Sequence, residues 1–68
     1  MLNANALRAE IARNGMTQNS VAKSIGISAN TFSSKMKTGK FGLNEVEAIA
    51  KLLNIDSRGI SAIFFNSQ

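Results

Sequence analysis

A single glycine, Gly26, separates two stretches of sequence that each carry apolar residues at helical spacing. The first stretch starts near Thr17 and the second at Ser28, so only residues 25–27 are left to turn the chain. Two helices joined by so short a turn must cross steeply and pack directly against each other. Their contact needs a small residue, which Ala22 provides, and the turn needs a residue that accepts positive φ, which Gly26 provides. The sequence therefore predicts a closely packed helix-turn-helix.

The rest of the chain is also expected to be helical, because it has no Pro and its apolar residues recur three and four positions apart. We predict an all-α fold, a compact bundle of about five short helices. It forms one domain over residues 1–68, with the helix-turn-helix at about residues 17–37. A chain this small buries only about 60% of the surface that its unfolded form exposes, so every helix has to contribute to the core.

Residues that cap helices set the expected boundaries. Helices are expected over residues 3–14, 17 to about 24, 28 to 36 or 37, 42 or 44 to 54, and from 56 onward. Either start of the fourth helix has an acid three residues on, Glu45 or Glu47, as in a capping box. The apolar stripe of this helix is Leu43, Val46, Ile49, Ala50 and Leu53. The later pair Phe64 and Phe65 could close the core, form a short strand or contact a second subunit.

The net charge of +4 is unevenly distributed. No acidic residue occurs between Glu10 and Glu45, whereas five cations fall inside that window: Arg13, Lys23, Lys35, Lys37 and Lys40. A segment of one sign is what an anionic partner favours. Charge alone is equally compatible with a basic surface that only meets solvent.

The composition argues against an enzyme and against a membrane protein. Without Cys or His the chain has no disulfide, no thiolate or imidazole metal site and no thiol redox chemistry. Its four carboxylates are spread along the chain, with no pair spaced as a metal site or an acid–base dyad. We therefore expect no catalysis, cofactor, metal or small-molecule substrate. No apolar run approaches the roughly 20 residues that span a bilayer, and the N-terminal residues lack the features of a signal peptide.

Residues 17–40, TQNSVAKSIGISANTFSSKMKTGK, resemble the helix-turn-helix of the lambda-repressor-like DNA-binding domains, the Cro/C1-type or XRE family of phage regulators. Gln18 opens the motif, Ala22 and Gly26 hold its small positions, and Phe32 holds the later apolar position. The segment GLNEVEAIAKLLNID resembles the family's fourth helix, and ISAIFF resembles the tails of short phage-encoded members. The resemblance extends from about residue 7 to residue 65.

The chain departs from the family at one position of the third helix. Many members place the second apolar residue of this helix three positions after the first, where this chain has Lys35. The apolar residue follows one position later, at Met36, which still lies on the face of Phe32. The helix is therefore expected to pack with a slight rotation, which changes which polar side chains point straight at a partner.

The resemblance implies that the recognition helix, about residues 28–36, lies in the major groove of double-stranded DNA. By position, the expected base-contacting residues are Ser28, Ala29, Asn30, Ser33 and Ser34. The Asn30 amide can bond N6 and N7 of adenine together. Ser, Asn and Thr are mediocre helix formers, which favours base contact over a merely solvated helix face. The expected phosphate-contacting residues are Thr17, Gln18, Asn19, Lys35, Lys37, Thr38 and Lys40.

These expectations describe a sequence-specific transcriptional regulator of the phage Cro or repressor type, located in the cytoplasm of a bacterial host at the nucleoid. One recognition helix reads few base pairs, so we expect a weak homodimer, completed on DNA at a two-fold-symmetric operator. The candidate dimer contacts are Ile60, Ile63, Phe64 and Phe65, and the same residues could instead close the core. The alternative function is a protein-interaction module, such as an antirepressor or accessory factor, on the same scaffold.

Overall fold

The computed structural model describes residues 1–65 of the chain. Within this range the regular secondary structure is entirely helical, which confirms the predicted all-α fold class. The helices are α1 (Ala4–Arg13), α2 (Gln18–Ile25), α3 (Ala29–Thr38), α4 (Leu43–Leu53) and α5 (Ser57–Phe64). They are joined by short turns at residues 14–17, 26–28, 39–42 and 54–56.

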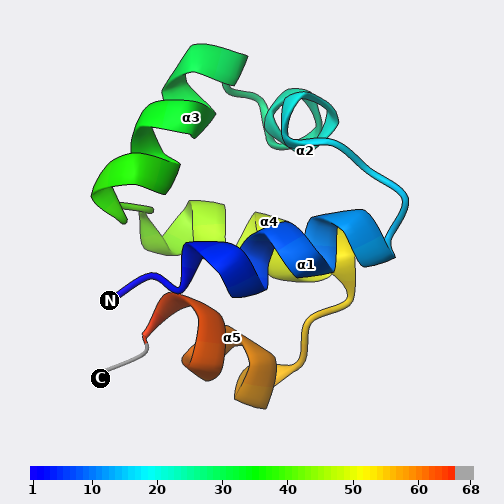
Figure 1. Ribbon diagram of the computed structural model, residues 1–68, viewed down its shortest axis with the longest axis vertical. Helices are drawn as coiled ribbons and strands as arrows, with labels where there is room; N and C mark the ends of the chain where they lie inside the picture. Colours follow the sequence, from blue (N-terminus) through cyan, green and yellow to red (C-terminus); the bar gives the residue numbers. More distant parts are fainter. Residues whose placement is uncertain (66–68) are drawn as a thin grey trace.

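The helices pack into a body of 28 × 23 × 20 Å. α2 contacts α1, α3 and α4, and α5 contacts α1 and α4. In Figure 1, α2 and α3 form one end of the molecule and α5 forms the opposite end. The N-terminal residues lie beside the end of α5, where the Asn3 N–H donates to the Ile63 carbonyl over 2.6 Å.

Side chains cap most helix starts, as the sequence predicts. In α1, α2, α3 and α5 the capping side chain accepts a hydrogen bond from a backbone N–H in the first turn; the capping residues are Asn3, Thr17, Ser28 and Asp56. α4 begins after Gly42, and the Glu45 carboxylate accepts from the Gly42 N–H over 2.8 Å. α3 runs to Thr38, slightly beyond its expected end, because Gly39 is the first residue to leave helical geometry.

The predicted contact between α2 and α3 is present at the turn. Ala22 retains only 1% exposure, and Val21 and Phe32 are fully buried beneath the two helices. Gly26 adopts φ +85°, a left-handed conformation that residues with a side chain rarely take. Gly26 thereby ends α2 and lets α3 begin three residues later, at Ala29.

The core is a cluster of apolar side chains from all five helices: Leu7, Ile11, Val21, Ala22, Phe32, Met36, Val46, Ile49, Leu53, Ile63 and Phe64. Phe41, from the turn before α4, adds an aromatic bridge to it. Its ring meets Phe32 and Phe64 edge to face, with centroids 5.6 and 5.8 Å apart. Phe41 thus joins α3 to the end of α5.

Two expectations about apolar residues need correction or refinement. Leu43 is 69% exposed and does not belong to the buried stripe of α4, because it is the first residue of the helix and its side chain is not packed against the core. Phe64 and Phe65 have separate fates, since Phe64 is buried in the core and Phe65 is 55% exposed. Neither residue forms a strand.

The described residues contain neither a membrane-spanning helix nor a cluster of metal-ligating side chains. None of their helices has the length and apolarity to cross a membrane. Their Asp and Glu side chains form no group of three that could hold a metal ion.

Candidate nucleic-acid interface

α3 has two distinct faces. Phe32 and Met36 point into the core, four residues apart, as the shifted apolar position predicts. The expected base-contacting residues all lie on the exposed surface: Ser28, Ala29, Asn30, Ser33 and Ser34. The first turn of α3 contains no acidic residue. The side chains of the five expected base-contacting residues are short and uncharged, which allows the backbone of α3 to come close to a partner surface.

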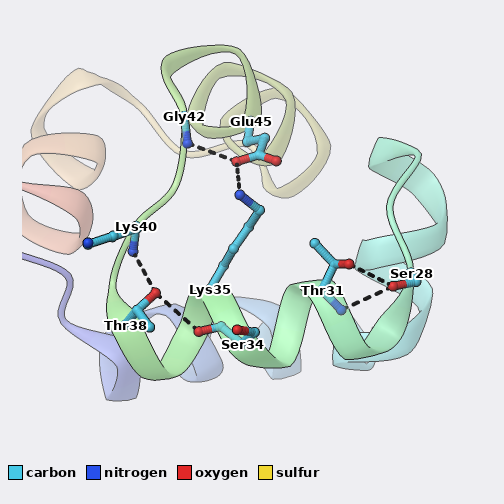
Figure 2. Close-up of polar contacts among 8 residues, drawn as sticks. All are labelled: Ser28, Thr31, Ser34, Lys35, Thr38, Lys40, Gly42 and Glu45. Carbon is cyan, nitrogen blue, oxygen red and sulfur yellow. Dashed lines mark hydrogen bonds and ion pairs between the residues drawn. The ribbon is translucent and has the colours of Figure 1, made fainter.

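Ser28 and Thr31 use their hydroxyls to begin the helix. Ser28 Oγ accepts from the Thr31 N–H over 3.1 Å and lies 2.8 Å from Thr31 Oγ1 (Figure 2). These contacts fix the first turn of α3. Among the described residues, the side chains of Asn30 and Ser33 make no hydrogen bond. Asn30 and Ser33 therefore keep their donors and acceptors for an external partner.

Thr38 holds the turn that follows the helix. Its hydroxyl donates to the Ser34 carbonyl over 3.2 Å and accepts from the Lys40 N–H over 3.4 Å (Figure 2). Thr38 was expected to contact phosphate, and it is exposed, although its hydroxyl also makes these two bonds within the protein. Its contribution is to place Lys40, whose side chain is exposed.

The lysines near the end of α3 differ in their surroundings. Lys35 Nζ lies 3.2 Å from Glu45 Oε1, and Figure 2 shows the Lys35 side chain extending from α3 to the start of α4. Lys37 and Lys40 are exposed, and neither forms an ion pair within the described part of the chain. Lys35 and Glu45 cancel each other's charge, so positive potential at this corner comes from Lys37 and Lys40.

The exposed polar groups of α3 and its following turn form one continuous surface. An open hollow is lined by Asn30, Thr31, Ser34, Lys35, Thr38 and Lys40.

A family model described as the Cro/C1-type HTH DNA-binding domain matches residues 6–57, from α1 to the first residue of α5. The chain belongs to the Cro/C1-type helix-turn-helix family. It is a DNA-binding domain of the regulator type. No curated protein and no solved structure matches the chain.

In this Cro/C1-type domain, the start of α2 is the second cluster of expected DNA contacts. Thr17 and Ser20 cap each other: the Ser20 N–H donates to Thr17 Oγ1 over 3.1 Å and the Thr17 N–H to Ser20 Oγ over 2.9 Å. Gln18 is half-buried and Asn19 is exposed, both in the first turn, which carries no acidic residue. The positive end of the helix dipole is therefore open to an anion.

The C-terminal candidates for a dimer contact lie mostly inside the Cro/C1-type domain itself. Ile63 and Phe64 belong to the core, and Ile60 is half-buried against it. Phe65 alone of the four is largely exposed. Core closure, one of the two uses expected for these residues, is therefore the observed role of Ile63 and Phe64.

Sequence reasoning missed the two contacts that order the ends of the recognition helix. Thr31 was given no role, although a hydroxyl three residues after Ser28 is a possible partner for the cap. Glu45 was assigned to the start of α4 but not to Lys35. A possible signal for that pair is that Lys35 occupies the position at which many family members have an apolar residue.

Proposed function

We propose that this domain is a sequence-specific transcriptional regulator of the phage Cro or repressor type, acting without catalysis or cofactor on double-stranded DNA. The observation that carries the proposal is the exposed face of α3, where short polar side chains lie beside Lys37 and Lys40. α3 enters the major groove with its N-terminal half at the base edges. Residues 1–68 act as one domain, in the cytoplasm of a bacterial host at the nucleoid.

Base reading falls chiefly to Asn30, Ser33 and Ser34, whose side chains make no hydrogen bond within residues 1–65. The Asn30 amide pairs with N6 and N7 of adenine, which is worth about 1–3 kcal/mol of discrimination against another base. Ser33 and Ser34 bond either groove edge or a bridging water. Ala29 contacts a thymine methyl, and the Ser28 hydroxyl, already engaged with Thr31, reads bases only if it exchanges that contact.

Phosphate contacts fix the register of α3 without reading sequence. Gln18 and Asn19 hold one phosphate at the N-terminus of α2, next to the Thr17 cap. Lys37 and Lys40 hold the backbone on the other side of the groove, with Thr38 fixing the turn between them. Their exposure supports this role. Affinity then falls linearly with salt on a double-logarithmic plot, with a slope of about −0.9 per phosphate contacted.

Two copies bind together on a two-fold-symmetric operator with half-sites about one helical turn apart. The dimer contact is small, and Phe65 is its candidate centre because it is 55% exposed at the end of α5. Pairing in solution is therefore weak and is completed on DNA.

A second candidate function follows from the same exposed phenylalanine. Phe65 and Leu43 are large apolar side chains that the described part of the chain leaves uncovered. They favour a protein-interaction module, an antirepressor or accessory factor, in which α3 plays no part. The two functions are distinguished by substitution: sequence-specific DNA binding depends on Asn30, whereas binding of a protein partner depends on Phe65.

Selection from randomised duplexes by the purified chain, at near-physiological salt, tests the proposal. A motif with two-fold symmetry and half-sites about 10 base pairs apart is expected. The variant Asn30→Ala should lose preference at one position of each half-site, whereas Asn5→Ala, an exposed asparagine on α1, should recover the same motif. A selection that enriches no motif contradicts sequence-specific recognition. Partner capture that depends on Phe65 but not on Asn30 would then support the interaction module.

A further inference from the structure

We propose that Lys35 and Glu45 are a positioning pair: Glu45 fixes the turn that presents Lys40 to DNA, and Lys35 neutralises the Glu45 charge instead of contacting phosphate. The inference rests on the proposed DNA binding and deepens it. It also assigns a role to the position at which this chain departs from the family pattern.

One carboxylate oxygen of Glu45 makes two contacts. Glu45 Oε1 accepts from the Gly42 N–H over 2.8 Å and lies 3.2 Å from Lys35 Nζ (Figure 2). The Lys35 and Glu45 side chains retain 28% and 23% exposure, so the pair is partly shielded from solvent. One oxygen thus ties the last residue of the turn to the recognition helix.

The rest of the same turn, residues 39–42, is also held in place. The Thr38 hydroxyl accepts from the Lys40 N–H over 3.4 Å, which fixes the near end of the turn. The Phe41 ring packs edge to face between Phe32 and Phe64, which anchors the middle. With Glu45 on Gly42, the backbone on both sides of Lys40 is held. Lys40 then needs to order only its own side chain when it meets a phosphate, which lowers the entropic cost of binding.

The pairing with Lys35 also changes the electrostatic effect of Glu45 on a bound DNA backbone. A carboxylate at the start of α4 is favourable for the helix and for the turn, but it lies at a corner where phosphates are expected. Unpaired, it would repel the DNA backbone, because like charges at close range are destabilising. Lys35 removes this repulsion by pairing with Glu45. An apolar residue at position 35 would leave the Glu45 charge uncompensated.

The salt dependence of DNA affinity tests these roles. It is measured on one duplex, an operator if one is recovered and otherwise a random-sequence duplex, for the native chain and four variants: Lys35→Met, Glu45→Gln, Lys35→Met with Glu45→Gln, and Lys40→Met. The amide of Gln can still accept from the Gly42 N–H, so Glu45→Gln removes charge while keeping the turn. Lys40→Met is the matched control for losing a phosphate-contacting lysine.

The proposal expects Lys40→Met to reduce the salt slope by about 0.9, the value for one phosphate. The double variant should keep the native slope, because it removes a pair with no net charge. Lys35→Met alone should weaken binding more than the double variant does, since it leaves Glu45 unpaired. If the double variant loses as much slope as Lys40→Met, Lys35 contacts phosphate and the proposal is wrong.

Amide hydrogen exchange without DNA separates this inference from the proposed function. Exchange at the Gly42 N–H should be faster in Glu45→Ala than in the native chain, and nearly native in Glu45→Gln. Equal exchange in all three proteins would overturn the role of Glu45 in the turn. If the native chain binds no duplex at any salt concentration, the proposed function fails, while the exchange measurement still decides whether the turn depends on Glu45.

Discussion

The backbone N–H of Ile27 donates a hydrogen bond to the carbonyl of Ala22 over 3.0 Å, across the turn between α2 and α3. The donor lies five positions after the acceptor, which is the hydrogen bond of a Schellman motif. This motif ends α2, with Gly26 in the left-handed conformation. The same small residue, Ala22, accepts this bond and allows α3 to approach. The crossing of α2 and α3 therefore depends on Ala22 and Gly26, neither of which is among the expected DNA contacts.

The substitution Gly26→Ala is expected to destabilise the chain by about 1–2 kcal/mol, because an L-residue is strained in the left-handed region. Space is not the cause, since no atom lies near the position that a Cβ would occupy. Gly42→Ala is the matched control: Gly42 has φ −71° and needs no left-handed backbone, so the change should cost only about 0.5 kcal/mol, from the poorer N-cap of α4. Urea unfolding followed by circular dichroism measures both. Equal stabilities for the two variants would contradict the assignment of strain.

Asn30→Ala and Lys40→Gln are expected to weaken DNA binding in different ways. Asn30→Ala should reduce discrimination at one base position by about 1–3 kcal/mol and leave affinity for random duplex unchanged. Lys40→Gln should weaken binding to every sequence and reduce the salt slope by about 0.9. Fluorescence anisotropy on operator and mutated duplexes separates the two. A uniform loss from Asn30→Ala would place this amide on the DNA backbone.

Phe64→Ala and Phe65→Ala are expected to separate core closure from association. Phe64 is buried against Phe41, so its truncation should cost about 3–5 kcal/mol and largely unfold so small a chain. Phe65→Ala should leave the free energy of unfolding within about 0.5 kcal/mol, because the ring is mostly exposed. Its expected effect is on cooperative occupation of two half-sites, measured by gel shift. Cooperativity that survives Phe65→Ala would remove Phe65 from the dimer contact.

Asp56→Ala is expected to cost about 1 kcal/mol, because Asp56 Oδ1 accepts from the Gly59 N–H over 2.9 Å at the start of α5. Asp56→Asn retains a cap acceptor and should lose much less. Thermal unfolding of the two variants makes the comparison. If both variants lose equal stability, the charge of Asp56 is more important than its hydrogen bond.

The sequence predicts the helices well because their ends are marked locally. Thr17, Ser28 and Asp56 cap the helices that they were expected to cap, and Asn54 ends α4 in the left-handed conformation. The exposure of Leu43 was predicted wrongly. Helical spacing places Leu43 in line with Val46, but periodicity does not say whether another element reaches that turn.

The candidate site was predicted by position but not by hydrogen bonding. Asn30 and Ser33 are exposed and unengaged within the described residues, as base contact requires. The hydrogen bond from the Lys40 N–H to Thr38 and the pairing of Lys35 with Glu45 depend on the path of residues 39–42. That path is fixed by Phe41 packing against two separate helices, a tertiary contact that local sequence patterns do not contain.

The short turns between the helices also determine how fast the chain can fold. Each helix docks on a neighbour that is close in sequence, with connections at residues 14–17, 26–28, 39–42 and 54–56. Helical proteins dominated by such local contacts fold in microseconds to milliseconds. The chain has no Pro, so it lacks the slow isomerisation phase that lasts tens of seconds. Temperature-jump relaxation should therefore be a single fast exponential, and the exposed face of α3 should be restored within milliseconds after each unfolding event.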